Sequence, residues 1–121
     1  MQGYYELKLC ADEQAVLNLG IVKERTALLN RLIDQYADQL AYMLQVYYSR
    51  EKVSRVTVVP DSIAAENPQS VKLMVIYVME EYNACSAVNT EVKTKMNLTA
   101  AVDDETGLLN IKGEYWPQLD D

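Results

Sequence analysis

Hydrophobic residues recur every three or four positions through the second quarter of the chain. These positions are Val22, Leu29, Ile33, Tyr36, Leu40, Met43 and Tyr47. Polar residues such as Glu24 and Arg31 fall between them, so one face of a helix would be apolar and the other polar. The spacing predicts one long amphipathic helix over residues 12–49. Gly20 can kink or interrupt this helix, because glycine costs about 1 kcal/mol in a helix interior.

Elsewhere the hydrophobic pattern has a period of two, which is typical of strands. We expect strands at residues 4–10, 53–59, 71–79, 91–102 and 108–116. Residues 60–70 contain two prolines and predict a connection rich in turns. Residues 70–85 are almost continuously apolar at their start and fit either a covered strand or a buried helix. Their β-branched and aromatic content favours the strand.

The segment 91–102 shows the clearest alternation of hydrophobic and polar residues. One face carries Val92, Met96, Leu98, Ala100 and Val102, and charged or polar residues occupy the other. Such a strand has one buried and one wet face, as in an antiparallel sheet. Residues 103–107 predict a hairpin loop. In the returning strand, Leu109, Ile111 and Tyr115 are expected to point inward.

These elements predict a single α+β domain over residues 1–121, with a frayed acidic tail at about 117–121. One long amphipathic helix would pack on a four- to five-stranded, mainly antiparallel sheet, which buries both apolar faces at once. The order of elements resembles the cystatin-like arrangement and, more loosely, the cone-shaped NTF2-like folds. The resemblance is one of topology, since the cystatin pattern Q-x-V-x-G is absent. It therefore implies no function.

The charge distribution limits the kinds of partner. The net charge of −7 belongs to residues 61–121, because residues 1–60 hold equal numbers of acidic and basic groups. No cluster of Lys and Arg is available for a phosphate backbone, so direct nucleic-acid binding is not expected. A protein partner with a basic surface would fit the acidic half. No segment is long and apolar enough to span a membrane, and the two cysteines, Cys10 and Cys85, fit reduced thiols in the cytoplasm.

The residues available for chemistry are few. The chain has no histidine, which removes histidine-based triads and histidine metal sites. Its four glycines form no phosphate-binding loop. The acidic loop at 103–105 lacks the spacing of a calcium loop. We therefore expect no catalytic residue, no metal and no cofactor, and the sequence favours a binding protein over an enzyme.

Tyrosine is the positive signal: the chain has nine tyrosines and no phenylalanine. A tyrosine ring packs like phenylalanine, but its hydroxyl needs a partner or water, so tyrosine suits interfaces and open pockets. Tyr42 falls on the polar side of the predicted helix. Trp116 ends the last strand and is expected to lie outside the core. With Tyr48, these two residues are the predicted interface of a small protein-binding module, expected to be a homodimer.

The alternative is a small-ligand-binding protein, or an enzyme without histidine, with a cavity between helix and sheet. The predicted lining is Tyr36, Met43, Tyr47, Met74, Tyr77 and Met96, with Glu80 as a polar anchor. Methionine would add an adaptable surface. The two hypotheses differ in where the tyrosine hydroxyls lie, at an interface or around an enclosed space.

Overall fold

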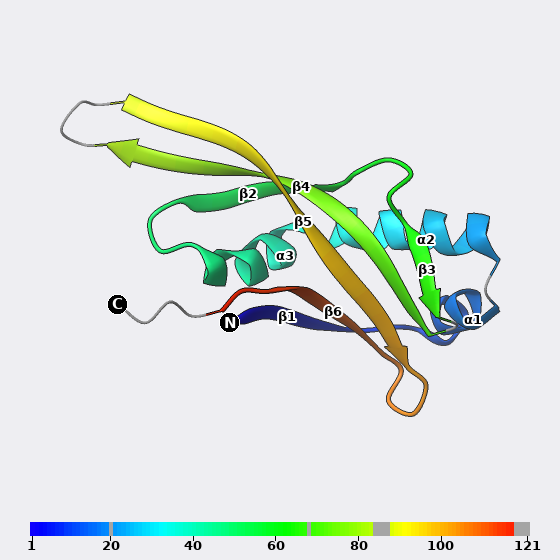
Figure 1. Ribbon diagram of the computed structural model, residues 1–121. Helices are drawn as coiled ribbons and strands as arrows, with labels where there is room; N and C mark the ends of the chain where they lie inside the picture. Colours follow the sequence, from blue (N-terminus) through cyan, green and yellow to red (C-terminus); the bar gives the residue numbers. More distant parts are fainter. Residues whose placement is uncertain (20, 68, 84–87, 118–121) are drawn as a thin grey trace.

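The computed structural model describes residues 1–19, 21–67, 69–83 and 88–117 of the chain. The structure combines three α-helices with a curled antiparallel sheet, and α1 lies at one end of it (Figure 1). The helices are α1 (Ala11–Leu19), α2 (Val22–Gln35) and α3 (Ala37–Leu44), followed by the 3₁₀ helix η1 (Gln45–Tyr47). The strands are β1 (Gln2–Lys8), β2 (Lys52–Val58), β3 (Ala64–Asn67), β4 (Ser70–Asn83), β5 (Val88–Asp103) and β6 (Leu108–Tyr115).

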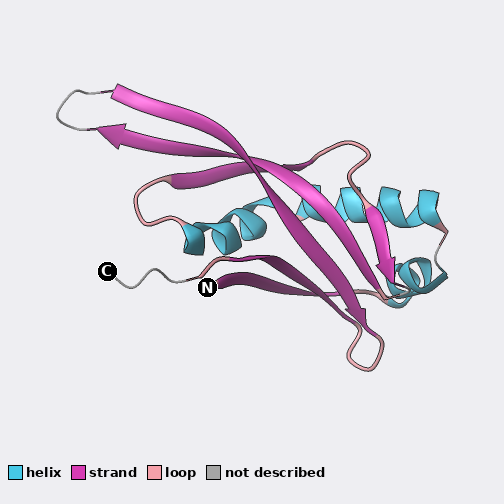
Figure 2. Cartoon of the chain, viewed as in Figure 1, coloured by secondary structure: helices cyan, strands magenta, loops and turns pink. Residues whose placement is uncertain are grey.

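The sheet has the strand order β1-β6-β5-β4-β2, and β3 forms a hairpin with the first residues of β4. All pairs are antiparallel. The sheet curls into a half-barrel whose hollow side holds α2 and α3 (Figure 2). The core fills this hollow, and its innermost side chains are Leu40, Leu44, Val75 and Tyr77, each with no exposed surface. The α+β class and the antiparallel sheet are therefore as the sequence predicts.

The single long helix predicted over residues 12–49 is wrong. The helical region is divided into α1, α2, α3 and η1, and α1 ends before α2 begins at Val22. A second break falls at Tyr36, whose backbone (φ −106°, ψ 23°) leaves the helical region. The Tyr36 ring packs against Tyr5 of β1, with 6.3 Å between ring centroids. Because of the break, the two shorter helices α2 and α3 can each follow the curved sheet, whereas one straight helix would diverge from it.

The sheet also differs from the expected four to five strands, because it has six. The extra strand is β3, which lies in the segment predicted as a connection. The open choice at residues 70–85 is resolved as the strand β4. The hairpin loop at 103–107 is confirmed, with Gly107 at a positive φ of 71°. The expected tail at 118–121 lies outside the described residues.

Most of the predicted inward-facing residues are buried, whereas Val102 is half-buried and two others are exposed. Met96, Leu98, Ala100, Leu109 and Ile111 are buried, as their alternation predicts. In contrast, Val92 is 49% exposed and Tyr115 is 68% exposed. Val92 lies on the part of β5 that extends past the helices, so its inner face is uncovered. Tyr115 follows a β-bulge in β6, because Tyr4 pairs with Lys112 and Gln2 with Tyr115, and the extra residue turns Tyr115 to the outer face.

Two features of the fold determine which parts of the sheet are exposed. The far ends of β4 and β5 project from the molecule as a two-stranded arm, because β2 pairs with β4 only as far as Glu80 (Figure 1). At the other side of the sheet, Met1 and Trp116 exchange hydrogen bonds of 2.8 Å. None of the described helices is both long enough and apolar enough to cross a membrane.

Candidate functional site

Four aromatic side chains from distant parts of the chain form a cluster at one end of the hollow. The members of this aromatic cluster are Tyr47, Tyr48, Tyr77 and Trp116. Trp116 packs edge-on against both Tyr47 and Tyr48, with ring centroids 4.7 and 5.8 Å away. The Tyr48 and Tyr77 rings are 6.0 Å apart. These separations fall in the range where aromatic pairs attract each other beyond simple burial.

The hydroxyl groups of this aromatic cluster have partners inside the protein. The Tyr47 hydroxyl accepts a hydrogen bond from the N–H of Gly3 (2.7 Å) and donates to the carbonyl of Glu114 (2.5 Å). Tyr48 and Tyr77 share a hydrogen bond of 2.5 Å between their hydroxyls. Burial raises the pKa of Tyr77 and that of Tyr47 above the ordinary value, so both stay protonated at neutral pH. The aromatic cluster therefore holds η1 and Tyr48 against β1, β4 and β6.

Glycine is required where the ring of Tyr47 crosses two strands. A Cβ at Gly3 would lie 2.9 Å from a Tyr47 ring carbon, and one at Gly113 would overlap the Tyr47 hydroxyl. The absence of side chains at these positions lets the ring lie directly on the backbone of β1 and β6. This end of the hollow is therefore filled by the ring.

The residues predicted to line a cavity do not meet around an empty space. Met43, Tyr47, Tyr77 and Met96 are buried together in the core. Tyr36 is half-buried at the α2–α3 break, Met74 is half-buried on β4, and Glu80 is half-buried at the base of the arm. Neither of the two pockets described in this structure is lined by any of these seven side chains. The ligand cavity remains a prediction that no described pocket supports.

Of the three predicted interface residues, Tyr42 alone has an exposed side chain. It lies on α3 with 82% of its surface exposed. The expectation that Trp116 lies outside the core is wrong, because the ring is half-buried against Tyr47 and Tyr48. Tyr48 is half-buried in the same aromatic cluster. Tyr115, rather than Trp116, is the exposed aromatic at the end of β6.

Tyr42 stands beside a shallow groove between α3 and β2. The groove has a volume of about 370 Å³ and is lined by Asp38, Ala41, Tyr42, Gln45, Lys52, Val53 and Ser54. Its floor is fixed by Gln45, whose amide bonds the carbonyls of Tyr48 and Glu51 and accepts a bond from the N–H of Val53. Its lining mixes both charges with neutral groups and so defines no particular ligand.

The sequence did not reveal a long unpaired edge on β5. This strand has 16 residues, whereas its neighbour β6 has 8 and pairs only with Thr99–Asp103. Beyond that segment, the N–H of Asn97 donates to the carboxylate of Glu114 (2.8 Å) instead of to a strand. The unequal lengths of the predicted strands at 91–102 and 108–116 were the available signal.

The position of Asn97 fixes which groups of β5 point outward. Its N–H faces away from β4, and the main-chain groups of successive residues point to alternate edges of a strand. The N–H and C=O groups of Lys95, Lys93 and Glu91 therefore face the open edge as well. The β4–β5 register has no bulge over this segment. Among the described residues, no strand pairs with this edge, so these polar groups are available to a partner.

The exposed side chains along this edge alternate in charge and polarity. Glu91, Lys93 and Lys95 are exposed on the outer face of the arm. Val92 lies between them on the inner face, half exposed, and Thr94 follows on the same side. We refer to residues 90–95 as the β5 edge. It combines free main-chain groups, opposite charges and one exposed apolar side chain.

Comparison with known proteins gives no family for this chain. The sequence matches no protein-family model and no curated protein.

Proposed function

We propose that this chain is a protein-interaction module that binds by adding a strand to the β5 edge, and that its partner is a second copy of itself. The observation that carries the proposal is the row of outward main-chain groups at Glu91, Lys93 and Lys95, which no described strand pairs. Exposed edges of this kind recruit extended chains through main-chain hydrogen bonds. The projecting arm keeps the edge clear of the rest of the molecule.

Charge selects the register between two copies. In an antiparallel pair centred on Val92, Glu91 lies opposite Lys93 of the second copy, and this ion pair occurs twice. A pair centred on Lys93 also forms two Glu91–Lys95 ion pairs but places the two Lys93 side chains opposite each other, and one centred on Thr94 opposes Lys93 and Lys95 twice. Opposite charges across a strand pair stabilise it and like charges weaken it. The register centred on Val92 is therefore favoured.

The same register also suits the inner face. Val92 would meet Val92 of the second copy across the two-fold axis, in a non-hydrogen-bonded pair where side chains approach most closely. Thr90 would face Thr94, a favourable cross-strand combination. Such a pairing would cover part of the 49% of Val92 that is exposed in the single chain. Lysine on an edge strand often prevents association, but here each Lys93 has a Glu91 to meet.

The interface would be short, and this sets its strength. Fewer than ten residues from each copy take part, which is below the roughly 1,200 Å² of a stable complex. We expect a dissociation constant on the order of 100 µM, equivalent to about 5.5 kcal/mol. Association of this strength responds to local concentration, which is typical of an accessory module in an assembly. A cytoplasmic location forms part of the proposal, since Cys10 is a free, exposed thiol.

The test is sedimentation equilibrium of charge-reversal variants at concentrations from about one to several hundred micromolar. Glu91→Lys alone, or Lys93→Glu alone, replaces two attractive pairs with two repulsive ones and should weaken the dimer about tenfold or more. The double variant Glu91→Lys/Lys93→Glu should dimerise like the natural chain. A mixture of the two single variants should form a heterodimer, because their charges are again complementary.

The matched controls are Glu105→Lys and Lys112→Glu, which change exposed residues of the β5–β6 loop and of β6 by the same charge without altering the β5 edge. Both should dimerise normally. A chain that is monomeric at every concentration would refute self-association. If the chain dimerises but the swapped pair restores nothing, the β5 edge is not the interface.

A further inference from the structure

Tyr42 is the most exposed of the large hydrophobic side chains in the described part of the chain. It lies on α3 with 82% of its surface exposed, and Val46, about one turn further along, is 51% exposed. The other exposed side chains of α3, Asp38 and Gln39, are polar. Covering a tyrosine ring buries about 150–250 Å², which is a large contribution from one side chain. Tyr42 and Val46 therefore form an apolar projection on a polar helix face.

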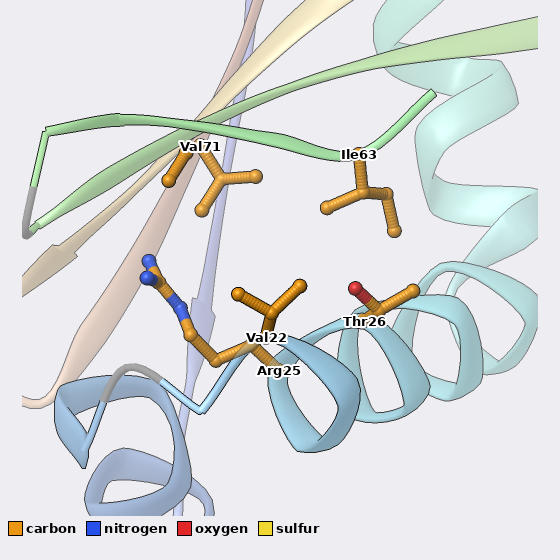
Figure 3. Close-up of a pocket in the computed structure, with 6 residues that line it drawn as sticks. Val22, Arg25, Thr26, Ile63 and Val71 are labelled. Atoms are coloured by element: carbon orange, nitrogen blue, oxygen red, sulfur yellow. The ribbon is translucent and has the colours of Figure 1, made fainter. Parts of the chain in front are cut away.

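The groove between α3 and β2 lies directly beside this projection. Its volume is about 370 Å³, and Tyr42 forms part of its wall. The pocket between α2 and the β3–β4 hairpin, lined in part by Val22, Ile63 and Val71, is much smaller (Figure 3). That pocket holds about 20 Å³, which is the space of about one water molecule. Of these two hollows, only the groove has room for a side chain as large as tyrosine.

The floor of the groove is fixed before any partner arrives. The Gln45 amide donates to the carbonyls of Tyr48 (3.2 Å) and Glu51 (2.7 Å), and it accepts a bond from the N–H of Val53 (2.9 Å). These three bonds hold the Gln45 side chain in one position. Ala41 and Val53 add apolar surface to the lining. A partner that enters the groove therefore has little of it to order, which favours binding.

A projection beside a hollow makes this surface complementary to itself. When two copies approach about a two-fold axis, Tyr42 of each copy would enter the groove of the other, as an isologous contact requires. The α3 wall of each copy would then face the β2 wall of the second copy. The α3 wall carries Asp38 and the β2 wall carries Lys52. Two ion pairs across the contact would follow, and such complementary charges fix the register of an interface.

We infer that the groove between α3 and β2 is a second self-association site, in which each copy inserts Tyr42 into the groove of the other. Where β2, β4 and β5 lie side by side, β2 and the β5 edge border the sheet on opposite sides. The groove contact therefore does not compete with pairing at the β5 edge and does not depend on it. A chain that makes both contacts would join more than two copies, and this consequence alone rests on the proposed function.

The experiment isolates the groove contact in Lys93→Pro. The N–H of Lys93 faces the open edge of β5, so proline there removes no bond to β4 but prevents the addition of a strand. Sedimentation equilibrium of this variant up to about 1 mM should still show a dimer. Adding Tyr42→Ser should weaken that dimer about tenfold or more. The control is Tyr115→Ser, which removes another exposed ring, outside the groove, and should leave the dimer unchanged.

The two ion pairs are tested in the same Lys93→Pro variant. Asp38→Lys alone, or Lys52→Asp alone, replaces two attractive pairs with two repulsive ones and should weaken the dimer. The two changes together should restore it, because the charges are again complementary. Asp34→Lys and Lys23→Asp change exposed charges of α2 outside the groove by the same amount, and neither should affect the dimer.

A direct measurement is isotope-filtered NMR on an equal mixture of labelled and unlabelled chains. We expect contacts between the Tyr42 ring protons of one copy and the Val53 methyl protons of the second copy. If Lys93→Pro is monomeric at every concentration, the groove is not a self-association site, and the β5 edge remains the proposed contact. A dimer that survives both Lys93→Pro and Tyr42→Ser would overturn both proposals.

Discussion

Replacing Tyr47 with phenylalanine tests whether the tyrosine hydroxyls hold this fold together. The change keeps the ring, which packs against Trp116 and lies on the backbone of β1 and β6. It removes one oxygen that accepts from the buried N–H of Gly3 at 2.7 Å and donates to the carbonyl of Glu114 at 2.5 Å. Tyr47 itself is 8% exposed, so water cannot readily replace the lost oxygen.

The magnitude follows from the groups left without partners. A buried donor or acceptor that loses its partner costs about 1–3 kcal/mol. The Gly3 N–H is fully enclosed, while the Glu114 carbonyl is half-buried and recovers part of its loss. We therefore expect Tyr47→Phe to lower the free energy of unfolding by about 2–4 kcal/mol. For a chain of this length, each kcal/mol corresponds to about 4 °C in Tm.

The assay is urea unfolding, with Tyr115→Phe as the matched control. Tyr115 is 68% exposed, so loss of its hydroxyl should change stability by less than about 0.5 kcal/mol. Amide hydrogen exchange gives a second measurement, since the Gly3 N–H should exchange faster in Tyr47→Phe. Equal stabilities of the two variants would show that the Tyr47 hydroxyl is not a structural element, and would refute the reasoning.

Two further predictions concern alkaline pH and backbone strain. Burial raises the pKa of Tyr47 and Tyr77 above the ordinary 10.0. Their contribution to stability is therefore complete below about pH 10 and is lost as the pH rises through the folded-state pKa values. Urea midpoints measured between about pH 9 and pH 11 should fall above pH 10, and a constant midpoint would contradict this. Arg55 has a positive φ of 55° at a β-bulge in β2. In denaturant unfolding, Arg55→Gly should leave the stability unchanged or raise it by up to about 1 kcal/mol. As the control, Lys52→Gly in the same strand should lower the stability by about 0.5–1 kcal/mol.

The strong alternation in β5 and β6 made these strands predictable, because each buries one face against the helices. β4 was predicted from its β-branched and aromatic content, since its apolar run is nearly continuous. β3 carries no such signal, since all four of its residues are exposed and its pairing with β4 depends on the hairpin alone. The break at Tyr36 was equally hidden. The three-to-four spacing continues through that residue, so the hydrophobic pattern gives no sign of the break.

The candidate surfaces were predictable only in part. The polar flank of α3 correctly indicated an exposed Tyr42. Trp116 lies on the inner side of the strand end because a β-bulge precedes it in β6, and sequence spacing does not reveal a bulge. For the β5 edge, the unequal lengths of the predicted strands at 91–102 and 108–116 were the available signal, and the location of the free main-chain groups required the strand pairing itself.

The meeting of Met1 with Trp116 has a consequence for how the chain is made. Among the described strands, β1 comes first in the sequence, β6 comes last, and β1 pairs with β6 alone. The bond between the Met1 amine and the Trp116 carbonyl spans 115 positions of sequence. β1 therefore has no pairing partner until β6 has also been synthesised. The closure of so large a loop makes this contact slow to form, so the half-barrel closes after the other described strands have been made.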